Sequence, residues 1–147
     1  MIKIAIIGSN GFIGESLRLY FQNSKKYKLF NLVSFKKTKK NWINKVCNQI
    51  KRIHPEVLIN CSANQDLNDD NKSIKNLINS NILATSLFLN QFSKSYSSKL
   101  YISFGTKYEF NKNRVFHPLN FYATTKHASD LFLKYYAIKK KNNYYFS

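Results

Sequence analysis

The sequence predicts an α/β fold in which a doubly wound parallel sheet carries helices on both faces. Apolar runs of strand length alternate with segments of helical periodicity, and no two runs are joined as a hairpin. A glycine-rich turn links the first apolar run to the first helical segment. Because crossovers between parallel strands are right-handed, successive helices should cover both faces of the sheet.

Length and composition narrow the class of protein. The 147 residues suffice for one domain with its own core. A hydrophobic fraction of 44% excludes a disordered chain, and no apolar run approaches the roughly 20 residues that span a bilayer. Cys47 and Cys61 form no Cys-x-x-Cys pair, so neither a disulfide framework nor a cysteine zinc site is expected. Met1 leads directly into the first strand without a secretory signal. We therefore expect a cytoplasmic protein with no membrane partner.

The formal net charge of +17 raises the question of a nucleic-acid partner. The lysines gather in short runs at predicted loops and helix ends: Lys25-Lys26, Lys36-Lys37, Lys39-Lys40 and Lys139–Lys141. Lysine in such places is ordinarily solvated surface. No helix-turn-helix, zinc-finger or RNA-stacking signature accompanies the charge. We favour solvated surface over a dedicated nucleic-acid site, although charge alone leaves the second reading open.

The first strand is expected at residues 2–7, and three glycines follow it with the spacing Gly-x-x-Gly-x-x-Gly. Leu17, Leu19, Tyr20 and Phe21 then place apolar residues at helical spacing. Backbone amides at a helix start are unpaired and can hold a phosphate, and glycine permits a tight turn, close approach to the phosphate and close helix packing. The turn alone is also compatible with an ordinary loop, which we consider the less favoured reading. The dinucleotide reading assigns cofactor contacts to Gly8, Asn10, Gly11, Phe12, Ile13 and Gly14.

The second strand is expected at residues 28–33. In a doubly wound fold the residues that follow this strand face the adenosine ribose, where a carboxylate favours NAD and basic residues accommodate the 2′-phosphate of NADP. Here the chain has Lys36 and Lys37 and no carboxylate. The cofactor prediction is therefore NAD(P), leaning towards NADP, with plain surface charge as the alternative explanation of the lysines.

The middle of the chain supplies a helix and a third strand. Residues 41–53 share an apolar face, which consists of Trp42, Ile43, Val46, Ile50 and Ile53. His54-Pro55 should end this helix, and residues 56–60 should form a buried strand. Three small residues follow, where backbone would lie close to a cofactor: Cys61, Ser62 and Ala63.

A long helical segment precedes the fourth strand. Its expected apolar stripe is Ile74, Leu77, Ile78, Ile82, Leu87, Phe88 and Phe92. Asn81 and Thr85 lie four residues apart and share a face, as ordinary helix-surface residues also would. The fourth strand is expected at residues 99–104, and Gly105 turns the chain after it.

Tyr122 and Lys126 form a second motif at the start of the last helical segment. The two residues lie one helical turn apart. A phenol is a poor base at neutral pH, but a neighbouring lysine cation favours the phenolate. Such a tyrosine can exchange a proton with a hydroxyl or carbonyl while a nicotinamide exchanges the hydride. Tyr-x-x-x-Lys is common by itself; its position after the glycine turn makes it specific.

Taken together, these motifs resemble the N-terminal part of extended short-chain dehydrogenases/reductases of the NAD-dependent epimerase/dehydratase family. The matching segments are Gly8–Gly14, residues 55–60 with Ser62-Ala63, Asn81 with Thr85, Ser103 with residues 105–108, and residues 120–126. The resemblance is greatest to members that modify nucleotide-activated sugars for surface polysaccharide. It implies a Rossmann-like NAD(P)-binding domain over residues 1–147, with Asn81, Tyr122 and Lys126 beside the cofactor.

Two departures from the family pattern affect the expected chemistry. The second residue of the paired Ser-Ser motif, usually catalytic, is Phe104, whose ring cannot hydrogen-bond a substrate oxygen. Thr106 or Ser103 would have to substitute, and Ser103 points to the other side of the strand from its neighbour. Residues 144–147 read as the start of a further strand, so we expect a chain truncated before the family's C-terminal substrate domain.

Three hypotheses follow. The first is an NAD(P)-dependent epimerase, dehydratase or reductase of nucleotide sugars, in which Tyr122, Lys126, Thr106 and Ser103 carry the catalysis. The second is a truncated, non-catalytic Rossmann-like domain that at most binds dinucleotide, and we expect the isolated chain to be inactive. The third, a nucleic-acid-binding module, depends on charge alone. An unpaired last strand would favour a homodimer or association through the sheet edge.

Overall fold

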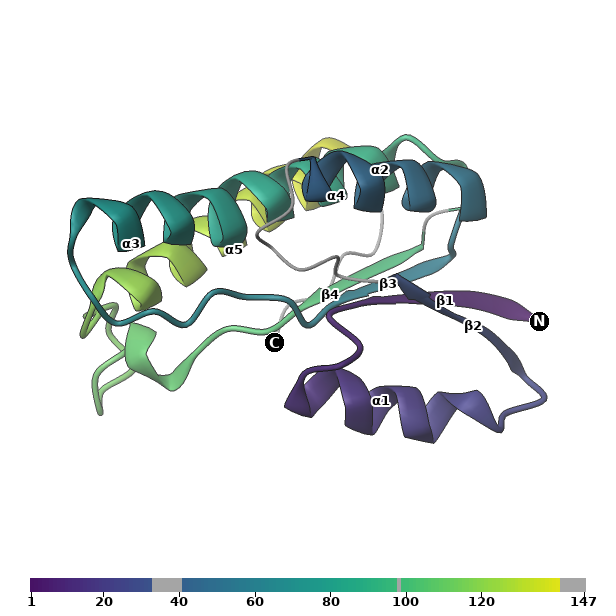
Figure 1. The fold of residues 1–147 in the computed structure, drawn as a ribbon, viewed down its shortest axis with the longest axis horizontal. Coiled ribbons are helices and arrows are strands. Elements are labelled where there is room, and N and C mark those ends of the chain that lie inside the picture. The colour runs from purple at the N-terminus through teal and green to yellow at the C-terminus, as the bar shows by residue number, and fades with distance from the viewer. Residues whose placement is uncertain (33–40, 98, 141–147) are drawn as a thin grey trace.

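A computed structural model describes residues 1–32, 41–97 and 99–140 of the chain. It contains a four-stranded sheet with helices on both faces (Figure 1). The strands are β1 (Ile2–Ile7), β2 (Tyr27–Leu32), β3 (Val57–Asn60) and β4 (Leu100–Ser103). They lie in the order β2-β1-β3-β4, and every neighbouring pair is parallel. The predicted fold class is confirmed.

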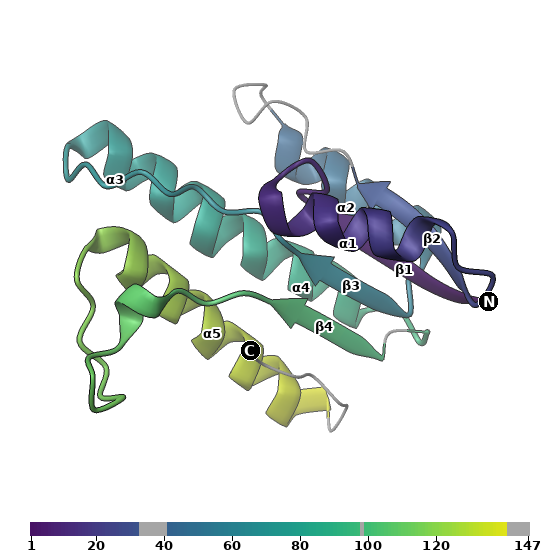
Figure 2. The same cartoon turned by 90° about the horizontal axis from the view of Figure 1, so that it is seen from below.

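The register of the sheet aligns the carboxyl ends of all four strands. Ile7 pairs with Leu32 on one side and with Asn60 on the other, and Asn60 pairs with Ser103. The segments that follow the strands therefore leave the sheet along one edge, which Figure 2 shows from below. In doubly wound folds ligands bind at this edge.

Helix α1 (Phe12–Gln22) covers one face of the sheet by itself among the described elements (Figure 1). Leu17 and Phe21 lie four residues apart and pack with the strand residues Ile4, Ile6 and Ile59. Leu19 and Tyr20, the other two apolar residues at the expected helical spacing, do not join this packing and are 51% and 76% exposed.

Three helices cover the other face: α2 (Trp42–Ile53), α4 (Ala84–Ser93) and α5 (Phe121–Lys140). The predicted apolar face of α2 is confirmed, since its members pack into the main core with Phe88 and Tyr101. Helix α2 ends at His54, which adopts a left-handed conformation at φ 49° immediately before Pro55. Within the described part of the chain, no helix is long and apolar enough to cross a membrane.

The long helical segment predicted from the apolar stripe between Ile74 and Phe92 is interrupted. Helix α3 (Asn71–Leu77) passes into a π-helical segment η1 (Ile78–Leu83) before α4 begins. The wider π turn rotates the side chains, so Ile78 is 42% exposed while Asn81 is buried. The predicted stripe is therefore correct at Leu77, Phe88 and Phe92 and wrong at Ile78. The expected strands at residues 28–33 and 56–60 match β2 and β3; Val33 and residues 144–147 lie outside the described residues.

Candidate functional site

The glycine turn between β1 and α1 is built almost entirely from backbone. Gly8 has a φ of +78°, a conformation that disfavours any residue with a side chain. The amide of Gly11 donates to the carbonyl oxygen of Gly8 at 3.1 Å, and Gly11 then caps α1 without a side chain. The turn is therefore closed by its own main-chain hydrogen bond.

Each glycine meets a different constraint. A Cβ at Gly14 would lie 2.2 Å from the carbonyl oxygen of Gly8, so the start of α1 could not pack against the turn. A Cβ at Gly8 would lie 2.9 Å from the amide nitrogen of Ser62, in the segment after β3. A Cβ at Gly11 would meet only the Gly8 carbonyl, at 3.5 Å. Gly8 and Gly14 thus allow close packing, whereas Gly11 keeps the outer side of the turn open.

The open side of the turn has the properties of an anion site. The first amides of an α-helix have no intrahelical acceptor and carry the positive end of the helix dipole. Asn10, Phe12 and Ile13 are exposed around this helix start, with Phe12 at 90%. The donor set and the missing Cβ of Gly11 fit a pyrophosphate group, and α1 is long enough, at 11 residues, to carry a dipole.

A buried hydrogen-bond network fixes the segment after β3. The Oδ1 of Asn60 accepts from the amide and the hydroxyl of Ser62, at 3.1 and 2.6 Å. The Nδ2 of Asn60 donates to the hydroxyls of Thr85 and Tyr101, both at 3.3 Å. All four residues are almost fully buried. The network anchors the backbone of the cofactor-binding candidates Cys61, Ser62 and Ala63 against the glycine turn.

Cys61 lies between the turn and α5. Burial raises the pKa of its thiol to about 11, and the positive charge of Lys126 acts in the opposite direction. The backbone of Cys61 also lies within 3.0 Å of the position that a Cβ of Gly8 would take. The fold therefore brings the Gly8 turn, Cys61 and Lys126 into one neighbourhood.

Asn81, within the π-helical segment, joins a loop to α5. Its Oδ1 accepts from the amide of Asn64 at 2.7 Å, while its Nδ2 donates to the Asn64 carbonyl and to the Thr125 hydroxyl, both at 2.9 Å. The Thr125 hydroxyl in turn donates to the carbonyl of Tyr122 at 2.7 Å. The side chain of Asn81 is thus committed to protein groups, and it positions the first turn of α5. A direct contact with a cofactor stays a prediction.

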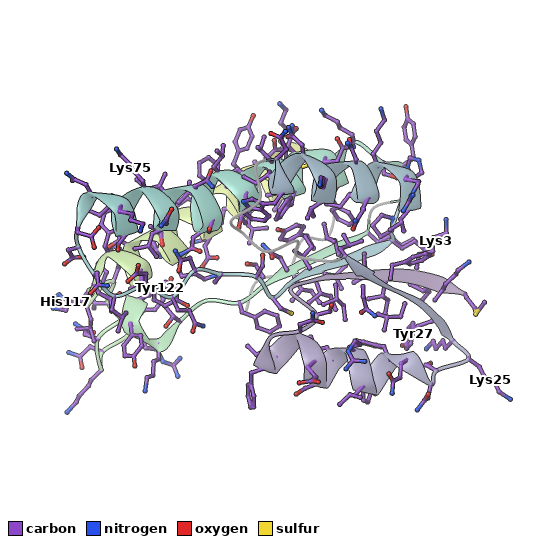
Figure 3. All side chains as sticks on the ribbon, in the orientation of Figure 1. Lys3, Lys25, Tyr27, Lys75, His117 and Tyr122 are labelled. Carbon is purple, nitrogen blue, oxygen red and sulfur yellow. The ribbon has the colours of Figure 1, made fainter. Side chains whose placement is uncertain are left out.

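Tyr122 and Lys126 are both buried at the start of α5, with exposed fractions of 8% and 6%. Figure 3 shows Tyr122 at the end of the molecule where the strands terminate, opposite to Lys3 and Lys25. Burial is the largest effect on Tyr122 and raises its pKa, a hydrogen bond with Gln65 lowers it, and the Glu109 carboxylate raises it. The pKa of Tyr122 is therefore raised overall, whereas a neighbouring lysine cation was expected to lower it.

The environment of Lys126 combines burial with negative charge. Burial lowers the pKa of its ammonium, and the carboxylates of Asp130 and Glu109 raise it. Burial is the largest effect, so the pKa of Lys126 is lowered overall, and the two acidic residues oppose this shift. They were not among the site residues predicted from the sequence. The Lys126-to-Asp130 spacing of four on a helix could have indicated Asp130, and the Thr106-x-x-Glu109 spacing of a capping box could have indicated Glu109.

Thr106 is one candidate for the hydrogen-bond donor to the substrate carbonyl. It is the N-cap residue of η2 (Lys107–Glu109). Its hydroxyl accepts from the amide of Tyr108 at 3.4 Å, and its own amide donates to the Oε1 of Glu109 at 2.7 Å. Ser103 is 3% exposed and lies two residues after Tyr101, which belongs to the main core, whereas Phe104 packs on the α1 side. The strand alternation expected for Ser103 and Phe104 is present.

One pocket of about 400 Å³ connects these regions. Its lining comes from the start of α1, the segment after β4 and the middle of α5: Ile13, Phe104, Gly105, Thr106, Lys107, Glu109, Phe110 and Asp130. The pocket thus unites the helix start of the glycine turn with Thr106 and with the helix that carries Tyr122. Lys36 and Lys37, the residues predicted to select NADP, lie outside the described residues.

Solved structures share this fold. A UDP-glucuronic acid 4-epimerase from Bacillus cereus in complex with NAD superimposes with a TM-score of 0.80 at 16% identity, covering 99% of this chain and 55% of that one. A UDP-Glc/GlcNAc 4-epimerase from Campylobacter jejuni gives 0.81 at 14%, covering 99% and 52%. A dTDP-4-dehydrorhamnose reductase from Bacillus anthracis in complex with NADP gives 0.76 at 22%, covering 99% and 52%. The chain spans about half the length of these structures.

The sequence itself gives one positive match. No curated protein matches the chain, whereas the profile of the NAD dependent epimerase/dehydratase family matches residues 4–146, nearly the whole sequence. The solved structures show similarity of fold alone, whereas the family profile shows to which family the sequence belongs. The chain belongs to the NAD-dependent epimerase/dehydratase family.

Proposed function

We propose that residues 1–147 form one NAD(P)-binding domain of an enzyme that epimerises, dehydrates or reduces a nucleotide-activated sugar. The observation that carries the proposal is the pocket that joins the helix start after the glycine turn to Thr106 and α5. A phosphate site made of backbone amides lies on one side of it, and buried Tyr122 and Lys126 belong to the same end of the fold. When bound, the nicotinamide cofactor would accept or donate the hydride.

The residues of the chain have separate tasks in this proposal. Tyr122 holds or releases a proton at its phenolic oxygen, and its raised pKa keeps it protonated in the free chain. Lys126 contributes the positive charge that Asp130 and Glu109 maintain in a buried place. Thr106, or Ser103 as the alternative, donates a hydrogen bond to the substrate oxygen. Lys36 and Lys37 accept the 2′-phosphate, which gives a preference for NADP.

The wider setting follows from the family's chemistry. The substrates are nucleotide sugars destined for polysaccharide, and the reaction takes place in the cytoplasm. The two cysteines are free thiols, which supports a reducing compartment. Association into a homodimer or through a sheet edge stays part of the proposal; the last predicted strand lies outside the described residues.

Dinucleotide binding is the first test. NADPH and NADH are titrated separately against the purified protein, with nicotinamide fluorescence as the readout. We expect saturable binding that is tighter for NADPH. Gly11→Val should abolish it in a variant that is still folded by far-ultraviolet circular dichroism, since the Cβ position at Gly11 is open within the protein. Tyr122→Phe should retain it. No binding of either dinucleotide at millimolar concentration contradicts the proposal.

A second candidate is a domain that binds dinucleotide without catalysing a reaction. Phe104 favours it, because this ring occupies the family's usual catalytic position and packs on the α1 side. The two candidates differ in a turnover assay with UDP-, GDP-, CDP- and dTDP-sugars plus NADP or NAD. Product formation that Tyr122→Phe eliminates supports the enzyme. Saturable dinucleotide binding without any product supports the binding domain.

A further inference from the structure

Next to the proposed redox residues, the structure gathers a second group whose chemistry differs. Glu109 of η2 and His127 and Asp130 of α5 each offer one ligand atom, and these atoms lie within 4.8 Å of one another. Glu109 and Asp130 also line the pocket described above. One imidazole and two carboxylates are ligands that divalent metals of the zinc class accept.

Glu109 is the unusual member of this group. Its exposed fraction is 1%, and its Oε1 accepts from the amide of Thr106 at 2.7 Å. Its Oε2 accepts no hydrogen bond from any residue that the structure describes, and the same is true of the Nδ1 of His127. A buried carboxylate oxygen without a hydrogen bond is costly, since it has lost water and gained no donor. The two atoms face each other across 3.5 Å.

This separation fits a bound ion better than a direct hydrogen bond. Two ligands at about 2.0–2.2 Å from a tetrahedral zinc lie about 3.3–3.5 Å apart. The imidazole is also held in place: the His127 ring stacks on Phe116 with centroids 4.1 Å apart and meets Phe110 edge-on at 5.9 Å. Two of the three ligand side chains are thus oriented by the groups they touch, as the ligands of known metal sites are oriented by their neighbours.

The local charge favours a cation as well. Glu109 and Asp130 place two carboxylates close together, with ligand atoms within 4.8 Å of each other. Lys126 offsets one of these negative charges, and an imidazole that binds a metal does so in its neutral form. The group therefore retains a negative charge in a strongly basic protein.

We propose that Glu109, His127 and Asp130 form a binding site for one divalent ion of the zinc class, with a fourth position open to the pocket. The site uses none of the residues that contact the dinucleotide or transfer the proton in the proposed function, although Glu109 and Asp130 also act there on the charge of Lys126. Metal binding and dinucleotide binding are measured separately, so the two proposals can fail separately. An ion here would hold η2 against α5 and thereby fix the segment that contains Thr106.

The test uses Co²⁺ as a spectroscopic substitute for Zn²⁺, with untagged protein stripped of metal by chelation. We expect one equivalent of Co²⁺ to produce the visible absorption of a tetrahedral site with a nitrogen and oxygen ligand set, and Zn²⁺ to displace it. Asp130→Asn and His127→Phe should each weaken Co²⁺ binding by at least about tenfold. His127→Phe keeps an aromatic ring for the stack on Phe116.

His117→Gln is the matched control, because His117 is an exposed histidine in the preceding loop (Figure 3) and should leave the titration unchanged. Far-ultraviolet circular dichroism establishes that each variant is folded. Absence of Co²⁺ binding by folded protein overturns the proposal, and so does binding that Asp130→Asn leaves intact. Equal affinity for Mg²⁺ overturns the assignment to the zinc class. NADPH titration of the same samples reports the dinucleotide site independently.

Discussion

The glycine turn and the surroundings of the first turns of α5 lie at the same edge of the sheet but are stabilised by different kinds of groups. The turn depends on the absence of side chains, because a Cβ at Gly8 or Gly14 would clash with neighbouring backbone atoms. The α5 cluster depends on buried polar side chains, among them Asn81, Lys126 and Glu109. The turn tolerates no added atom at Gly8 or Gly14, whereas the α5 cluster tolerates no lost partner.

The turn should show the largest effect. Gly14→Ala places a Cβ 2.2 Å from a backbone oxygen, and we expect it to lower the free energy of unfolding by about 3 kcal/mol. This loss occurs even though alanine exceeds glycine in helix propensity by about 1 kcal/mol. Urea denaturation measures it. Gly11→Ala is the control and should leave stability nearly unchanged; equal destabilisation by both variants would mean that the three glycines have no separate roles.

On the α5 side, Asn81→Ala should have the next largest effect. It removes three hydrogen bonds to Asn64 and Thr125 and leaves buried partners unsatisfied. We expect a loss of about 1–3 kcal/mol in the free energy of unfolding. Asn79→Ala, on an exposed position of the same π-helical segment, should cost less than about 0.5 kcal/mol. Similar losses in both variants would contradict the positioning role of Asn81.

The two regions also differ in how far the sequence predicts them. The three glycine roles follow from a local pattern, because a strand, a turn and a helix are adjacent in the chain. The π-helical segment does not follow, since residues 71–92 fit a regular helical period and only tertiary packing selects the wider turn. Its consequence is that Ile78 faces solvent while Asn81 turns inward.

The burial of Glu109 could not be predicted. Its spacing from Thr106 fits a capping box at the start of η2, but its burial arises when η2 packs against α5. Tyr122 and Lys126 were predictable as a pair from their spacing, but the direction of the Tyr122 pKa was not. That direction depends on desolvation and on Glu109, both of which are properties of the packed structure.

The hydroxyl of Tyr101 accepts a hydrogen bond from Asn60 at the end of β3. Its ionisation should have a smaller, pH-dependent effect on the free energy of unfolding. Burial raises the pKa of its phenol, and a hydrogen bond with Asn60 lowers it by less. In the unfolded chain a tyrosine ionises near pH 10, so this contribution to stability is complete below about pH 10 and is lost as the pH rises further. The slope approaches about 1.4 kcal/mol per pH unit.

Chemical denaturation between pH 8 and 11 measures this loss. Above pH 10 the free energy of unfolding of Tyr101→Phe should fall less steeply than that of the wild type, because the variant has no phenol to ionise at this position. Tyr96→Phe is the control, since Tyr96 is fully exposed and should leave the profile unchanged. Parallel profiles for wild type and Tyr101→Phe would show that the ionisation of Tyr101 is not linked to unfolding.

The smallest effect reports whether the two regions interact electrostatically. Cys61 has a pKa of about 11, and the charge of Lys126 lowers it against the effect of burial. Lys126→Met should therefore raise the Cys61 pKa. A unit charge screened by solvent at several ångströms contributes about 0.5 kcal/mol, roughly a twofold change in the thiolate fraction. Alkylation by iodoacetamide at pH 9, in a Cys47→Ser background, should slow by about that factor.

Lys75→Met provides the comparison for this last measurement, because Lys75 is an exposed lysine of α3 (Figure 3) and its loss removes the same charge. A slower reaction in both variants would reflect net charge alone. A slower reaction only in Lys126→Met would mean that the ammonium of α5 acts on the segment that the glycine turn packs against. An unchanged rate in both would separate the regions electrostatically, and the positive charge of Lys126 would then act on α5 and η2 alone.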